Sequence, residues 1–292
     1  MTLNRFLIPI MLLIFSLFSP ITASAKTSIT AEKLWEIKRV GTPVVSPDGR
    51  RSAILVTQFD MEQNNSSSFI YLMDNANGQL NQLTFSGKDS SPVWKPDGTA
   101  LAFVSRRADG PAQLYLMSIH GGEAQKITDL PVGVFSPQWF PDGSSIAFGA
   151  IIQPEYGGDW EQMKSLQKKQ KESKMTAKVT ENSTFRYWDR WLTDGHFPRL
   201  FSVDIISRKV TDLMPNTSNF FNMMGGVSYS IAPDGKTIAV SMNSSQAPFN
   251  IINNDIYLLQ TDGSGSMINV TPGNVASDDS PLYSPCGKFI LY

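Results

Sequence analysis

The amino-acid sequence predicts an all-β fold, a β-propeller of four-stranded antiparallel blades. The tripeptide Pro-Asp-Gly recurs between short apolar runs, at residues 47–49, 96–98, 141–143 and 233–235, with an altered copy at Pro285-Cys286-Gly287. Proline presets the second position of a type I turn, aspartate can bond its own backbone, and glycine adopts the positive φ that closes a hairpin. Each copy therefore predicts a strand, a tight turn and a second strand.

The spacing of these hairpins predicts the repeat unit. Their starts lie 49, 45, 92 and 52 residues apart, and a period of this size is typical of repeat architectures. An apolar strand follows each hairpin, and a polar strand then ends in Leu83-Thr84, Ile127-Thr128, Val210-Thr211 or Val270-Thr271. Four strands per unit correspond to one propeller blade.

Residues 1–25 predict a secretory signal peptide. Arg5 supplies a positive charge, Phe6 to Phe18 form an apolar run of 13 residues, and Ala23-Ser24-Ala25 matches the cleavage-site pattern. The alternative is a membrane anchor, but this run is shorter than the roughly 20 residues that span a bilayer. We therefore expect a secreted, periplasmic protein without a stable membrane anchor.

Residues 26–42 predict a short helix and a lead-in to the propeller. Thr30 can cap a helix that extends to Arg39, with Leu34, Trp35 and Ile37 on one side. Residues 43–292 then hold the blades. We expect blade one to end near Phe85, and the later blades to span about 91–128, 135–213, 227–271 and 281–292.

The 92-residue interval contains only one further apolar strand, Leu200–Val203, and this predicts an insertion at about 151–196 in the third blade. The stretch from Trp160 to Lys174 is polar and predicts an exposed helix or a mobile loop. The aromatic stretch that follows can be a hydrophobic plug, or a surface that faces a substrate or a second domain. Its candidate site residues are Arg186, Trp188, Asp189, Trp191 and His196.

The composition excludes several functions. A formal net charge of −1 does not favour binding to nucleic acid. Cys286 is the only cysteine, so there is no disulfide framework, and we interpret it as a turn residue that replaces aspartate. The sequence has no G-x-S-x-G, H-E-x-x-H, Walker or G-x-G-x-x-G motif, and both histidines, His120 and His196, lie in expected loops. We therefore predict no catalytic residue, no metal site and no cofactor in this chain.

Several stretches together resemble a known family. They are the leader, the short helix with VGTPVVSPDGR, the WKPDGTALAFVS blades and RYWDRWLTDGHFPRLFSVD. Over residues 26–292 they are similar to the N-terminal propeller of prolyl-oligopeptidase-family serine peptidases, in particular the secreted bacterial dipeptidyl and acylaminoacyl-peptidase-like enzymes. The most specific part runs from Arg186 to Gly195, whereas Pro-Asp-Gly blades also occur in the Tol-system periplasmic propeller.

This resemblance implies a propeller of seven or eight blades that covers a C-terminal α/β-hydrolase domain, which supplies the catalytic Ser, His and Asp. We expect that domain to be absent from this chain. The final KFILY reads as the second strand of a hairpin, so we expect a fragment of about four and a half blades, with open edges near Val44 and Ile290.

The resemblance further implies that the parent protein cleaves short peptides and that this chain restricts access to its site, without activity of its own. The alternative is a non-enzymatic periplasmic propeller of the Tol type that binds a protein partner. The peptide specificity and the oligomeric state stay open at this stage.

The leader generates the first testable prediction. Export should be followed by cleavage after Ala25, because the small residues at positions 23 and 25 fit the cleavage-site pattern. N-terminal sequencing of the exported protein should begin at Lys26, and a mature chain that still begins at Met1 would contradict the assignment.

Overall fold

The computed structural model describes residues 28–153, 156–175, 177, 196–215, 217, 219, 221, 226–245 and 253–292, and the backbone of 186–187 and 190–191. The chain divides into two units, Met1–Ile37 and Lys38–Tyr292. The predicted signal peptide lies outside the described residues. Within the part that is described, no helix is long and apolar enough to cross a membrane.

The first unit contains helix α2 (Ala31–Glu36). Thr30 caps it as predicted, since its side-chain oxygen accepts a hydrogen bond from the Lys33 amide at 3.3 Å. The helix is shorter than expected, because Ile37 is already extended and Arg39 belongs to a strand. From Arg39 onward, the backbone forms its hydrogen bonds with a longer strand instead of with a further turn of helix.

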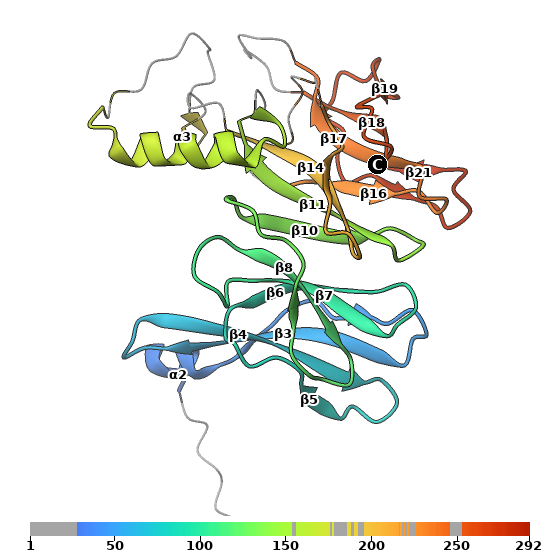
Figure 1. Cartoon of the computed structure of the whole chain (residues 1–292). Helices are drawn as coiled ribbons and strands as arrows, with labels where there is room; N and C mark the ends of the chain where they lie inside the picture. Colours follow the sequence, from blue (N-terminus) through green and yellow to red (C-terminus); the bar gives the residue numbers. More distant parts are fainter. Residues whose placement is uncertain are drawn as a thin grey trace, which may run out of the picture. The chain divides into compact units, whose positions relative to one another are not determined.

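The second unit consists of successive antiparallel sheets, and each sheet is one blade except for a two-stranded sheet in the insertion (Figure 1). In blade one, β1 (Arg39–Val40) and β2 (Val44–Val45) share the place of the first strand and pair with β3 (Arg51–Asp60), followed by β4 (Asn65–Asp74) and β5 (Leu80–Gln82). Blade two comprises β6 (Asp89–Trp94), β7 (Ala100–Ser105), β8 (Gln113–Ser118) and β9 (Gln125–Lys126).

Blade three comprises β10 (Val134–Trp139), β11 (Ser145–Ile152), β14 (Phe197–Asp204) and β15 (Val210–Asp212). Between β11 and β14 it carries α3 (Trp160–Glu172), β12 (Arg186–Tyr187) and β13 (Arg190–Trp191). Blade four comprises β16 (Tyr229–Ile231), β17 (Thr237–Asn243), β18 (Asn254–Gln260) and β19 (Met267–Asn269). β20 (Leu282–Tyr283) and β21 (Ile290–Leu291) begin a fifth sheet. The predicted fold class, an all-β propeller with a partly helical insertion in the third blade, is confirmed.

The repeated hairpin turn has the predicted geometry in every copy. The glycines at positions 49, 98, 143, 235 and 287 have φ between 69° and 73°. The amide of each glycine donates to the carbonyl three residues earlier, at 2.8 to 2.9 Å. Asp142 Oδ1 accepts from the Ser144 amide at 2.9 Å, and the equivalent bond recurs at Asp48, Asp97 and Asp234. The Cys286 copy keeps the turn because Gly287 still supplies the positive φ.

Aromatic side chains two residues before the turn proline join neighbouring blades. The Trp94 indole N–H donates to the Val44 carbonyl of blade one at 2.7 Å. Trp139 donates in the same way to Val93 of blade two at 3.3 Å. In the fifth sheet Tyr283 takes this place, and its hydroxyl lies 2.9 Å from the Thr237 hydroxyl of blade four. These three junctions therefore have a directed bond in addition to their apolar contacts, whereas blade four has Ile231 at this position.

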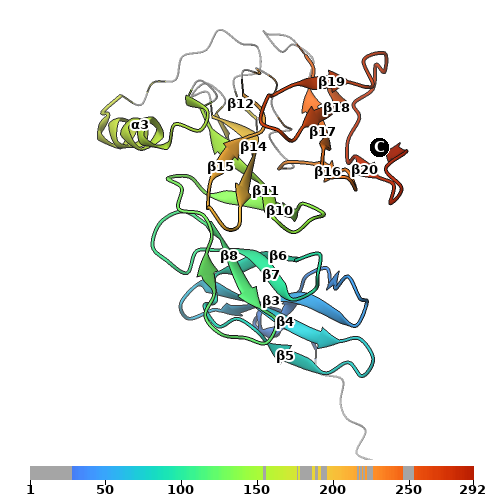
Figure 2. The same ribbon diagram turned by 45° about the vertical axis from the view of Figure 1, so that its right-hand side comes forward.

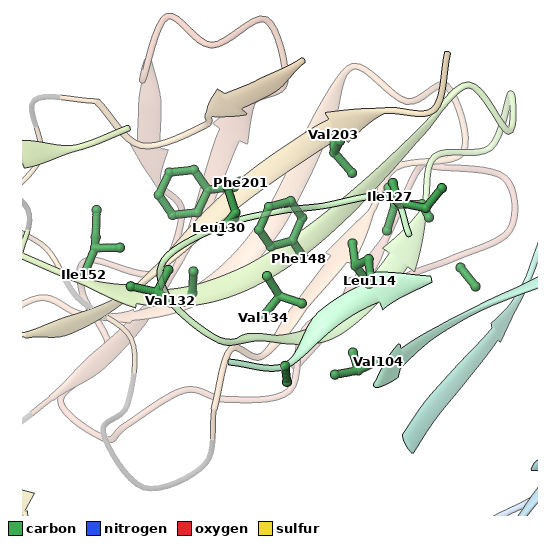
Figure 3. Close-up of a cluster of buried hydrophobic side chains, with 14 of the residues drawn as sticks. Val104, Leu114, Ile127, Leu130, Val132, Val134, Phe148, Ile152, Phe201 and Val203 are labelled. Carbon is green, nitrogen blue, oxygen red and sulfur yellow. The ribbon is translucent and has the colours of Figure 1, made fainter. Parts of the chain in front are cut away.

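The hydrophobic core is divided among the junctions between neighbouring blades, which follow one another in chain order (Figure 2). The largest cluster joins blades two and three, where Phe148 and Phe201 stack at 5.9 Å between ring centroids. Leu114 of blade two and Val134 of blade three pack in the same cluster (Figure 3). Each blade therefore buries its faces only against its neighbours, as in other repeat proteins.

The end of blade three differs from the expectation. In blade one the Leu83 amide donates to the Ile70 carbonyl. The equivalent bond in blade three runs from the Leu213 amide to the Leu200 carbonyl. Leu213 and Met214 therefore take the place that we had predicted for Val210-Thr211. The hydrogen-bond register of the strand decides this position, not the Val-Thr pattern. Met214 also lacks the hydroxyl with which Thr84 of blade one accepts a hydrogen bond from the Ile70 amide at 2.9 Å.

The aromatic junctions generate a second prediction. Trp94→Phe removes the donor to Val44 while keeping most of the buried ring, so the free energy of unfolding should fall by about 1 kcal/mol. Urea unfolding measures the change. The matched control is Trp35→Phe, at an exposed position of α2, which should leave stability within about 0.5 kcal/mol. Equal effects of the two substitutions would contradict the role of the indole.

Candidate functional site

The two ends of the blades differ in charge. Because adjacent strands are antiparallel, the Pro-Asp-Gly turns lie at one end, and the β7–β8 and β17–β18 connections lie at the other, together with the insertion of blade three. We call the latter the insertion end. The charged side chains that are buried within the described residues all lie there: Asp89, Arg199, Asp255 and Asp278. The aspartates of the turns are largely exposed, and a hydrogen bond from the Lys95 ammonium, together with bonds from Thr99, lowers the pKa of Asp97 to about 2.

The first half of α3 fixes the insertion to the propeller. Asp159 caps the helix by accepting from the Gln162 amide at 3.0 Å. The Trp160 ring lies 5.3 Å from that of Phe201, and Met163 is fully buried in the same core. Of the two predicted alternatives for this stretch, the helix is confirmed. Sequence reasoning missed the anchor, although aromatic and apolar residues at i and i+3 are a detectable signal of a packed helix face.

The predicted site residues lie in and just after the second half of the insertion. Arg186 and Trp191 are directly paired positions of the β12–β13 hairpin, and only their backbone is described. Trp188 and Asp189 lie outside the described residues. His196 directly precedes β14 at the insertion end and is half-buried. The structure thus brings together the backbones of Arg186 and Trp191, while the roles of these five side chains stay a prediction.

Arg199 is a buried cation that sequence reasoning did not single out. It lies near the start of β14 and is 1% exposed. Its guanidinium donates to the Thr217 carbonyl at 3.0 Å and lies 3.4 Å from the Asp212 carboxylate. Its Nε has no hydrogen-bond partner among the described residues. Burial lowers the pKa of Arg199, and Asp212 opposes this shift. The Arg199 guanidinium is therefore a buried positive group with incomplete hydrogen bonding, near the start of β14, where the insertion ends.

A second buried ion pair lies at the same end of blade two. The Asp89 carboxylate accepts from Arg107 at 2.9 Å through one oxygen, and its other oxygen has no hydrogen-bond partner within the described residues. The Arg107 guanidinium also lies over the rings of Phe103 and Tyr115, at 5.0 and 4.9 Å from their centroids. Nothing in the sequence pattern marks Asp89 as buried, because the burial depends on the neighbouring blade.

The buried charged groups at the insertion end have the chemistry of a ligand-binding site. Carboxylates, guanidinium groups and amides can bind and orient a polar or charged ligand through hydrogen bonds. Within the described residues, no group of three His, Cys, Asp or Glu side chains could hold a metal ion. The fold, with neighbouring four-stranded blades and one elaborated end, defines a β-propeller whose candidate site lies at the insertion end.

The chain belongs to the TolB beta propeller domain family, whose sequence model matches residues 25–185, more than half of the chain. It is 32% identical over 235 residues to the uncharacterized peptidase YuxL of Bacillus subtilis, an alignment that covers 80% of this chain and 34% of the relative. It is 24% identical over 279 residues to dipeptidyl-peptidase 5 of Porphyromonas endodontalis, covering 92% and 39%. The chain thus spans less than half the length of these relatives, and the resemblance to peptidase propellers is confirmed.

Solved structures show the same fold. The acylaminoacyl peptidase of Pyrococcus horikoshii superposes with a TM-score of 0.60 at 15% identity, covering 84% of this chain and 34% of the other. TolB of Acinetobacter baumannii superposes with a TM-score of 0.51 at 20% identity, covering 87% and 48%. At these identities the similarity concerns the fold alone.

The buried Arg199 generates a third prediction. Arg199→Met removes the cation and leaves Asp212 without its ion-pair partner, so the free energy of unfolding should fall by about 3 kcal/mol. Chemical denaturation measures it. The double variant with Asp212→Asn should recover part of the loss, because the carboxylate is then no longer charged. A double variant that is as unstable as the sum of the single variants would show that the pair is not coupled.

Proposed function

We propose that this chain is the N-terminal propeller of a secreted serine peptidase that cleaves short peptides, of the dipeptidyl or acylaminoacyl type. The similarity to YuxL carries the proposal, because it extends over 80% of the chain and that relative is named a peptidase. The resemblance of the stretch from Arg186 to Gly195 to the propeller insertions of such enzymes supports it independently.

In this proposal the parent protein divides its tasks between domains. The reaction follows an acyl-enzyme route, in which a serine attacks the peptide carbonyl, a histidine takes and returns its proton, and an aspartate orients the histidine. In this proposal these residues belong to a separate α/β-hydrolase domain of the parent protein. The propeller contributes selection, because it covers the site and admits only small peptides.

The candidate site fits this role at the insertion end. We propose that Arg186, Trp188, Asp189, Trp191 and His196 face the peptide or the hydrolase domain. Support comes from their position in the insertion, which leaves the propeller where the buried charges gather. Aromatic rings can pack on apolar parts of a peptide, while Arg and Asp can bind its polar groups.

The domain boundaries of the proposal follow the sequence. Residues 1–25 are a signal peptide, 26–42 a helix and lead-in, and 43–292 the propeller, with the insertion at about 151–196. The signal peptide would send the protein to the periplasm, where short peptides are available as substrates.

A second candidate is a non-enzymatic propeller that binds a protein partner. The name of the matching family and the superposition on TolB favour it. The peptidase proposal has stronger support, because YuxL is 32% identical over 80% of this chain and is named a peptidase, whereas TolB of Acinetobacter baumannii is 20% identical. The two candidates differ in whether a reactive serine accompanies the propeller.

The test uses an antibody raised against residues 28–153 to isolate the native protein from cells, followed by labelling with a serine-directed fluorophosphonate. The peptidase proposal expects a labelled band well above the size of a 292-residue chain. An unlabelled band at the size of that chain would refute it and favour the partner-binding candidate.

The chain by itself should not cleave peptides, because it carries no nucleophile motif. Purified protein should give no turnover with dipeptidyl or acylaminoacyl chromogenic substrates. Turnover that survives purification and is blocked by a serine-directed phosphonate would contradict this expectation.

A further inference from the structure

The end of helix α3 carries a group of positive charges at the surface. Four lysines lie in its final turns or directly after it: Lys168, Lys169, Lys171 and Lys174. We call these four residues the lysine patch. All of them are exposed, and none forms an ion pair with another residue in the described part of the chain. By contrast, Lys164 in the middle of the helix pairs with Glu161 at 2.8 Å.

The charge of this patch exceeds what the helix needs. Basic residues in the last turn favour a helix through its dipole. Lys164, Lys168 and Lys171, however, follow one another at spacings of four and three residues, where like charges lie side by side and destabilise a helix. Residues 164–174 hold five lysines and one acidic residue, Glu172, which can neutralise one lysine at most, in a chain whose formal net charge is −1. Helix stability therefore does not explain the patch.

The structure holds this helix in a fixed position. Trp160 and the fully buried Met163 attach its first half to the core between blades two and three. Farther along, the Gln167 side-chain amide donates to the Pro131 carbonyl, in the loop that leads into blade three, at 3.1 Å. The lysine patch begins at the next residue, and this part of α3 extends beyond the sheets (Figures 1 and 2). A partner therefore meets a helix that is already formed and placed, which lowers the cost of binding.

We propose that the lysine patch binds an acidic segment of polypeptide in an extended conformation. Charge complementarity requires an anionic partner. Side chains three residues apart on a helix, such as Lys168 and Lys171, have Cβ atoms about 5–6 Å apart. Alternate side chains of an extended chain lie on one side at a spacing of about 6.6 Å. Carboxylates in a Glu-x-Glu pattern therefore match neighbouring lysines of the patch. The inference concerns binding alone and does not depend on peptidase activity.

An anionic membrane surface fits the patch less well. A helix that lies on a membrane buries an apolar face between the lipids, with its basic residues on the other face. In α3 the large apolar side chains are Trp160, Met163 and Leu166, and all three are fully or partly buried in the protein. The helix therefore has no apolar face left for lipid, and an acidic polypeptide, which needs only the charges, is the partner that this surface favours.

Fluorescence anisotropy on the full chain tests the surface with two peptides that carry the same label, Glu-Thr-Glu-Thr-Glu and Gln-Thr-Gln-Thr-Gln. Glutamine has the shape of glutamate without its charge. At low salt we expect the glutamate peptide to bind at least about fivefold more tightly, because several exposed ion pairs form together. This preference should disappear at about 0.5 M salt, which screens exposed charges. Equal affinity at low salt would overturn the proposal. So would binding to phosphatidylglycerol vesicles without a preference for the glutamate peptide, since the partner would then be a lipid surface.

A pair of double variants locates the binding surface. Lys168→Gln with Lys171→Gln should remove most of the preference for the glutamate peptide. The matched control is Lys209→Gln with Lys236→Gln, which makes the same change of charge at exposed positions near the Pro-Asp-Gly turns and should keep the preference. A preference that survives in the first variant, or that falls equally in both, would overturn the assignment to the lysine patch. All four lysines are exposed, so both variants should fold.

Discussion

The fold depends on one junction that recurs from blade to blade. The strand before each Pro-Asp-Gly turn pairs with the next strand of its own sheet and also packs on the preceding blade. The Pro-Asp-Gly turn fixes the hairpin register through a glycine near φ 70°. In the second, third and fifth sheets this places an aromatic residue at the junction, and in blade four it places Ile231 there. Trp94, Trp139 and Tyr283 each bond to the blade before them. Because faces are buried only between neighbours, the stability of every blade depends on the next one.

The same arrangement separates two kinds of charge. At the turns, aspartates bond to nearby backbone and are largely open to solvent, so they shape the hairpins at little cost. At the insertion end, Asp89, Arg199 and Asp278 are buried, and each has an atom without a hydrogen-bond partner in the described part of the chain. Buried charge that is incompletely paired lowers stability, and such groups gather at functional sites more often than elsewhere. This asymmetry supports our proposal that the insertion end carries the candidate site.

The insertion adds to this end without disturbing the blade. Its helix is fixed by Trp160 and Met163 on the core of blade three, and β14 then resumes the sheet at Phe197. In the proposed peptidase, this element would contact the substrate or the hydrolase domain while the blades stay rigid.

The sequence by itself determined the blades, because turn chemistry is local and repeats in every copy. It also determined the cap of α2, the position of the insertion and the family, each from contiguous residues. The tertiary structure decided what depends on residues distant in the chain. Helix α2 ends early where Arg39 joins a sheet, and Leu213 rather than Val210 closes blade three because its amide reaches Leu200. The burial of Arg199 and Asp278 follows from packing between elements, which no local pattern encodes.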